Sequence, residues 1–85
     1  MPTLSMFYGI LIRMYYDDHN PPHIHAVYNN DTACFTLDGE LLDGSIPKKQ
    51  RKLVEAWIEI HRDELDANWK LAQEGEPFFK IEPLK

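Results

Sequence analysis

The sequence predicts an α+β fold: an antiparallel meander of about four strands, then one long helix or two stacked helices, and a short C-terminal strand. Residues 7–42 contain short runs rich in β-branched and aromatic residues, and Asn, Asp, Pro and Gly separate these runs. Residues 48–74 instead repeat apolar side chains at spacings of three and four, which is typical of an amphipathic helix. With 85 residues the chain can form one core, so we expect a single domain over residues 1–85.

Turn residues divide the first half of the chain into its strands. The four strands are expected over residues 7–16, 23–28, 32–37 and 40–42. Gly9 lies inside the first run and is a candidate for a bulge or a close backbone approach. Residues 29–31 predict a tight hairpin turn, and Asp38-Gly39 predicts the next turn. Consecutive runs joined by such short turns favour antiparallel pairing.

The helical half begins at Pro47, because proline is tolerated near the first helical position. The apolar pattern extends from Lys48 to Glu74, and Gly75 then ends it. The pattern fits one long helix, and it fits equally two stacked segments that break near residues 61–63. A last short strand is expected over residues 78–81.

The charge of the chain is uneven along its length. The net charge is −5, and residues 1–46 carry six acidic side chains against one basic side chain, Arg13, whereas residues 47–85 carry eight of each. Nonspecific binding of nucleic acid needs a positive field over much of the surface, so this composition argues against it. A local basic site remains compatible with the charge.

Two further sequence features bear on the cellular compartment and on membrane insertion. Cys34 is the only cysteine, so an internal disulfide is impossible and a reducing, cytoplasmic location fits best. The apolar stretch of residues 6–12 is short and is followed by Arg13, so we expect neither export nor membrane insertion.

The segment HNPPHIHA, residues 19–26, holds three of the four histidines. Side chains two positions apart in a strand share a face, so His23 and His25 are expected to lie together while Ile24 faces the other way. His19 could fold back toward them, because the two prolines between it and His23 restrict the backbone. Three imidazoles suit a borderline divalent metal such as Zn²⁺.

Two imidazoles would also suffice for acid–base catalysis, for which phosphodiester cleavage is the reaction we consider. The neighbouring Asp17 and Asp18 could orient a ring or complete a metal shell. The alternative is that the histidines only pack against nearby tyrosines at a turn or on the surface.

Basic side chains supply two candidate anion sites. Four of them lie in the first turns of the helix: Lys48, Lys49, Arg51 and Lys52. Together with free backbone N–H groups they could bind phosphate, although a solvated helix end paired with Glu55 is the simpler interpretation. Arg13 could bind an oxyanion beside the histidine turn, or it could pair with Asp17 or Asp18.

Several segments closely resemble one family of small bacterial proteins, the domain-of-unknown-function family 4160. The resemblance rests on residues 7–13, 19–26, 44–47, 61–65, 68–69 and 81–84, together with Trp57. Members are typically cytoplasmic and are often encoded beside a second small domain of the family numbered 2442, in an arrangement like a toxin and antitoxin pair. The resemblance implies that this chain is the toxin-like component, and it carries over to His19, Pro21, Pro22, His23 and His25.

Three hypotheses of function follow. The first is a toxin-like protein, neutralised by its antitoxin-like neighbour, that acts on RNA or a nucleotide. In it His23 or His25 serves as general base or acid, and Arg13 or the basic helix start holds phosphate. The second is a noncatalytic protein-interaction module. The third is a metal-binding domain in which His19, His23 and His25 are the candidate ligands of a divalent ion.

Overall fold

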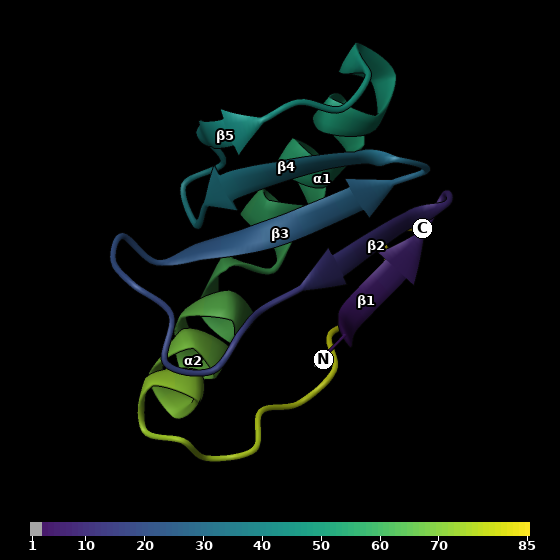
Figure 1. Cartoon of the computed structure of the whole chain (residues 1–85). Coiled ribbons are helices and arrows are strands. Elements are labelled where there is room, and N and C mark those ends of the chain that lie inside the picture. The colour runs from purple at the N-terminus through teal and green to yellow at the C-terminus, as the bar shows by residue number, and fades with distance from the viewer. Residues whose placement is uncertain (1–2) are drawn as a thin grey trace.

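The structure, a computed structural model, describes residues 3–85 and confirms the predicted α+β class. Five antiparallel strands lie side by side in the order in which they occur along the chain, and two helices follow them (Figure 1). The strands are β1 (Thr3–Phe7), β2 (Ile10–Arg13), β3 (His23–Tyr28), β4 (Asp31–Thr36) and β5 (Leu41–Gly44). The helices are α1 (Lys48–Ile60) and α2 (Arg62–Gln73).

The first predicted strand, over residues 7–16, is wrong in its extent. It contains the turn of a hairpin, because Tyr8 and Gly9 have φ angles of 48° and 76° and separate β1 from β2. A two-residue turn with positive φ at both positions matches the twist of the paired strands. Gly9 is therefore a turn residue rather than a bulge, and the meander has five strands where about four were predicted.

The two-helix alternative is the correct one. His61 has φ −108° and ψ 25°, which ends α1 and begins α2. Arg62 then fixes the start of α2 to the β4–β5 turn, because its guanidinium donates to the Leu37 carbonyl oxygen at 2.8 Å and pairs with the Asp38 carboxylate. Within residues 3–85, no helix has the length and apolar character needed to cross a lipid bilayer.

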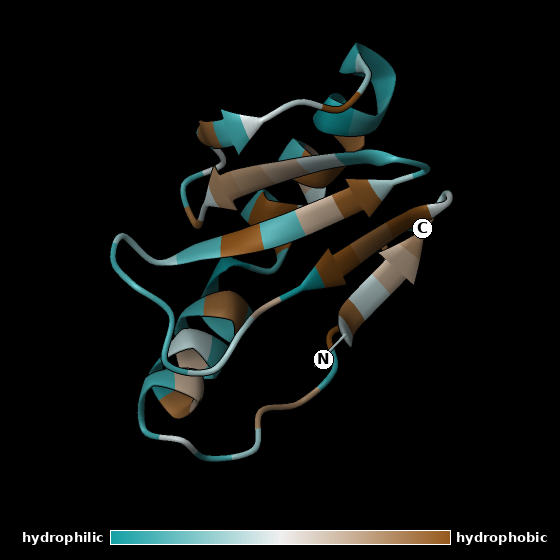
Figure 2. Ribbon diagram, viewed as in Figure 1, coloured by the Kyte–Doolittle hydropathy of each residue, from teal (hydrophilic) through white to brown (hydrophobic). Residues whose placement is uncertain are grey.

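The helices cover one face of the sheet, and the core lies between them (Figure 1). Hydrophilic and hydrophobic residues alternate over the first part of β3, as expected for a strand with one face in the core (Figure 2). Ile24 and Ala26 are fully buried in the core, where they join Phe35 and Trp57. The alternation consequently sends His23 and His25 to the opposite face.

The strand predicted over residues 78–81 does not form, although the segment lies beside β1 (Figure 1). One backbone bond joins them, from Ile81 N–H to the Leu4 carbonyl at 2.8 Å. The fully buried Asn68 side chain replaces a strand partner: its Nδ2 donates to the Phe79 carbonyl at 2.7 Å, and its Oδ1 accepts from the Phe79 N–H at 3.1 Å. A side chain thus satisfies backbone groups that a ladder would otherwise pair.

Gly44, at the end of β5, tests how closely β5 approaches β4. A Cβ atom there would lie 2.1 Å from the Thr32 carbonyl oxygen, and φ is +71°. We expect Gly44→Ala to lower the free energy of unfolding by roughly 2 kcal/mol or more, because left-handed strain adds to a backbone clash. Urea unfolding followed by circular dichroism measures the change.

Gly75 is the matched control, since its φ is +73° but nothing lies within 4 Å of the corresponding Cβ position. Gly75→Ala should cost about 1 kcal/mol, the strain alone. Equal losses in the two variants would contradict the close approach of β5 to β4.

Candidate metal centre

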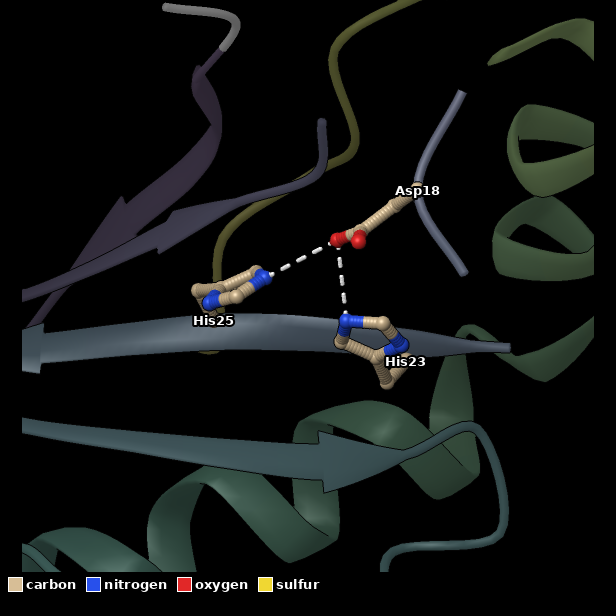
Figure 3. A group of neighbouring side chains, drawn as sticks. All are labelled: Asp18, His23 and His25. Atoms are coloured by element: carbon tan, nitrogen blue, oxygen red, sulfur yellow. Dashed lines mark hydrogen bonds and ion pairs between the residues drawn. The ribbon is translucent and has the colours of Figure 1, made fainter. Parts of the chain in front are cut away.

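His23 and His25 lie at the start of β3 and project from the face opposite to the one that Ile24 and Ala26 bury in the core. The loop between β2 and β3, residues 14–22, brings Asp18 over them. Figure 3 shows both rings directed from β3 toward the Asp18 carboxylate. The Asn20–Pro21 peptide bond in this loop is cis.

The loop is attached to the end of α2. The Asp17 N–H donates to the Ala72 carbonyl at 3.2 Å, and Gln73 Nε2 donates to the Asp18 carbonyl at 3.0 Å. On the other side, the Leu37 N–H donates to the Pro22 carbonyl at 3.3 Å. Asp18 is therefore positioned by both the sheet and the second helix.

One carboxylate oxygen meets both rings. Asp18 Oδ2 lies 2.9 Å from Nε2 of His23 and 3.3 Å from Nε2 of His25. For metal–ligand bonds of about 2.0–2.1 Å, neighbouring ligands are separated by about 3.0 Å around an octahedral ion and about 3.3 Å around a tetrahedral one. The three donor atoms all lie within 4.8 Å of one another, so a divalent ion could contact all three after small side-chain movements.

The two rings differ in their surroundings. The His23 side chain is 3% exposed and packs against Trp69 of α2, with ring centroids 5.4 Å apart. His25 is 20% exposed and meets the ring of Tyr15 at 4.5 Å in an edge-on arrangement. The centre is thus closed at His23 and open to solvent at His25.

The contact of His23 Nδ1 with the Pro21 carbonyl assigns which ring nitrogen carries the proton. Nδ1 lies 2.7 Å from the Pro21 carbonyl oxygen, which can only accept, so Nδ1 carries a hydrogen and donates it. A neutral imidazole has one N–H, which leaves a lone pair on Nε2 facing the Asp18 carboxylate. Two facing acceptors repel each other. A cation must therefore lie between them, either a second proton on His23 or a metal ion.

The contact with Cys34 allows His25 to carry its proton on either ring nitrogen, so Nε2 can donate to Asp18 or bind a metal ion. The Cys34 Sγ atom lies 3.2 Å from Nδ1 of His25. Burial raises the pKa of the Cys34 thiol, and the charges of Asp43 and Asp18 raise it further, so the thiol keeps its proton at neutral pH. The thiol can donate to Nδ1 while Nε2 donates to Asp18, or Nδ1 can donate to sulfur while Nε2 is free to bind a metal.

The Asp18 carboxyl is held in its charged form. Partial burial raises its pKa, but the His19 backbone N–H, the hydrogen bond from His25 and the charges of His23 and His19 outweigh burial. The pKa of Asp18 consequently lies below its ordinary value of 3.8. A carboxylate that stays ionised is suited to bind a cation.

His19 lies at the margin of this group. Its Nδ1 is 3.0 Å from the other carboxylate oxygen, Asp18 Oδ1, and its side chain is 84% exposed. All three imidazoles considered from the sequence thus surround Asp18, and the His19 ring lies 5.3 Å from the His23 ring. The tightest group of donor atoms is that of Asp18, His23 and His25. The sequence named Asp18 as a neighbour of the histidines, and the path of the loop makes it the central member.

Arg13 is directly opposite His25 in the pairing of β2 with β3. Its Nε atom is buried and has no hydrogen-bond partner among the residues that the structure describes. Nor does Arg13 form an ion pair with Asp17 or Asp18. The structural pairing considered from the sequence is therefore absent within residues 3–85.

The basic helix start lies at the other end of the sheet. Gly44 pairs with Ala33 and the Ser45 N–H donates to Thr32, so α1 begins near the β3–β4 turn, whereas His23 pairs with Thr36 at the opposite end of β4 (Figure 1). A groove there is lined by Ile46, Lys48, Arg51, Lys52 and Glu55, and Lys49 is exposed nearby. These side chains and the histidines do not share one cleft.

The family model described as "Domain of unknown function (DUF4160)" matches residues 9–70. The chain belongs to this family. The matched part of this DUF4160 protein includes Arg13, the three residues of the candidate centre and Trp69. No curated protein and no solved structure matches the chain significantly.

The lowered pKa of Asp18 predicts a pH-dependent contribution to stability in protein kept metal-free with a chelator. A group whose pKa is lower in the folded state stabilises the fold above its unfolded pKa and loses this effect as pH falls through the folded pKa. The difference in free energy of unfolding between wild type and Asp18→Asn should therefore shrink between about pH 5 and about pH 2. Urea titrations across this range measure it.

Asp17→Asn serves as the control, since Asp17 is exposed and adjacent and asparagine tolerates its positive φ of 53°. A difference for Asp18→Asn that stays constant with pH, or one matched by Asp17→Asn, would contradict the assignment.

Proposed function

We propose that this protein binds one divalent first-row metal ion through Asp18, His23 and His25, and that the bound ion is its functional centre. The observation that carries the proposal is the pair of contacts on the His23 ring. Nδ1 lies 2.7 Å from the Pro21 carbonyl, to which it must donate, so only a cation can join Nε2 to Asp18 across 2.9 Å. A metal-binding histidine usually donates its other ring N–H to a carbonyl or carboxylate in this way.

The donor set supports a particular class of ion. Two imidazole nitrogens and one carboxylate oxygen suit Zn²⁺ and the neighbouring transition metals better than Mg²⁺ or Ca²⁺, which prefer all-oxygen ligands. Three protein ligands also leave coordination positions for water, which is the usual composition of a catalytic zinc site. When bound, such an ion supplies an activated water at neutral pH.

Hydrolysis of a phosphodiester is the reaction that we assign to this centre. The substrate would be RNA or a nucleotide, and the chain would act as the toxin-like component of a cytoplasmic pair with an antitoxin-like protein of the family numbered 2442. The partial exposure of His25 supports access for a small substrate or a single-stranded segment. His19 contacts the outer carboxylate oxygen from an 84% exposed position, where an ion pair contributes little, and it would not bind the ion.

Metal content tests the proposal directly. Protein purified without a histidine tag, loaded with Zn²⁺ and dialysed, should retain about one equivalent by elemental analysis. Asp18→Asn and His23→Gln should each reduce retention at least about tenfold, because each removes a ligand. His19→Gln should retain wild-type content.

Retention below about a tenth of an equivalent by wild type would overturn the metal proposal and leave a proton as the cation at His23. Equal loss in His19→Gln would contradict the choice of ligands. Circular dichroism of each variant confirms that the fold is retained.

Expression in a bacterial host tests the toxin-like role. The wild-type chain should arrest growth when expressed alone, and co-expression of the neighbouring gene should relieve the arrest. The double variant His23→Ala, His25→Ala should be harmless, since it removes two ligands, while His19→Gln should stay toxic. A harmless wild type, or an equally toxic double variant, would exclude this role.

A further inference from the structure

We propose that Arg13 forms an oxyanion subsite beside the metal centre, so that the ligand taken by this protein is an anion with phosphate-like oxygens that contacts the metal and the guanidinium together. The inference rests on the proposed metal function and names the chemistry of what binds there.

The first observation is the register of the sheet. Arg13 and His25 are directly opposite each other in β2 and β3, and such pairs have Cβ atoms about 4.5–5.5 Å apart on one face of a sheet. The same row continues to Cys34 on β4 and Asp43 on β5. The Arg13 side chain therefore leaves the sheet next to the ring that carries Nε2 of His25.

The second observation is the direction from which the centre is open. Trp69 packs on His23, whose side chain is 3% exposed, whereas His25 is 20% exposed and Arg13 is half-buried. The His25 side is therefore an open approach to the metal, and Arg13 is the neighbour of His25 across the β2–β3 pair.

The third observation is that Arg13 lacks a partner. Two other arginines of the chain form ion pairs: Arg51 with Glu55, and Arg62 with Asp38 and Asp66. Arg13 forms none with the described residues, and its buried Nε has no hydrogen-bond acceptor there. The buried Nε is a costly unpaired donor, but it is shielded from solvent, so an oxyanion would be bound by the terminal nitrogens of the guanidinium.

Asp18 is not available as that partner, because its oxygens are occupied. Oδ2 contacts the rings of His23 and His25, while Oδ1 contacts His19 and accepts the His19 backbone N–H at 2.9 Å. Asp18 is thus shared among three histidines and forms no ion pair with Arg13.

The charges around the centre make Arg13 the side chain on which anion binding there depends. It is the only basic residue among residues 1–46, which carry six acidic side chains, and the cluster of Lys48, Arg51 and Lys52 lies at the far end of the sheet. Guanidinium binds phosphate through two parallel hydrogen bonds, and lysine cannot reproduce this geometry. The subsite should therefore distinguish arginine from lysine.

Binding of inorganic phosphate to Co²⁺-loaded protein tests the inference, because the visible spectrum of Co²⁺ reports both metal binding and ligand exchange at the ion. Wild type should show a protein-bound Co²⁺ spectrum that phosphate changes in a saturable way. Arg13→Gln should keep the Co²⁺ spectrum and weaken phosphate binding about ten- to a hundredfold. Arg13→Lys should recover only part of this affinity.

Arg51→Gln is the matched control, since it removes a charge from the basic groove, and it should bind phosphate as wild type does. Equal phosphate affinity in wild type and Arg13→Gln, with the Co²⁺ spectrum intact, would overturn the Arg13 subsite and leave the metal proposal standing. Absence of any protein-bound Co²⁺ spectrum in wild type would overturn both. A loss in Arg51→Gln equal to that in Arg13→Gln would place the anion elsewhere and contradict the inference.

Discussion

The hydrogen bond from His23 Nδ1 to the Pro21 carbonyl is the constraint on which the site depends. It fixes a proton on Nδ1, which faces the proline turn, so Nε2 of the neutral ring can only accept. Because Asp18 Oδ2 stands 2.9 Å from that other nitrogen, the neutral ring and the carboxylate are both acceptors. The geometry is stable only with positive charge between them, and that requirement links a local turn to a chemical function.

The fold supplies the rest of the arrangement. β3 directs Ile24 and Ala26 into the core, and this burial fixes the direction of the two histidines between and beside them. α2 contributes Trp69 as a wall against His23 and holds the Asp18 loop by backbone and side-chain hydrogen bonds. Residues from the β2–β3 loop, β3 and α2 meet only when the domain is folded, so the centre and the fold should be lost together.

Part of this arrangement could be predicted from the sequence. The α+β class and the shared face of His23 and His25 follow from periodicity, which is a local property. The helix break near His61 was one of two alternatives that the periodicity left open. The β1–β2 hairpin was missed because its turn places Tyr8 at positive φ, a conformation that few side chains favour. The last strand was predicted wrongly because the pairing of Phe79 with the Asn68 side chain depends on tertiary contact. The path of the loop, which makes Asp18 the residue that all three histidines contact, depends on α2, which is far away in sequence.

The nitrogen NMR spectrum of labelled imidazoles, recorded while Zn²⁺ is added to the folded protein, tests the account most directly. The account predicts that Nδ1 of His23 keeps its proton throughout, while the Nε2 signals of His23 and His25 shift together as the ion binds. A spectrum that Zn²⁺ leaves unchanged, or one in which Nδ1 of His23 is the nitrogen that responds, would contradict it.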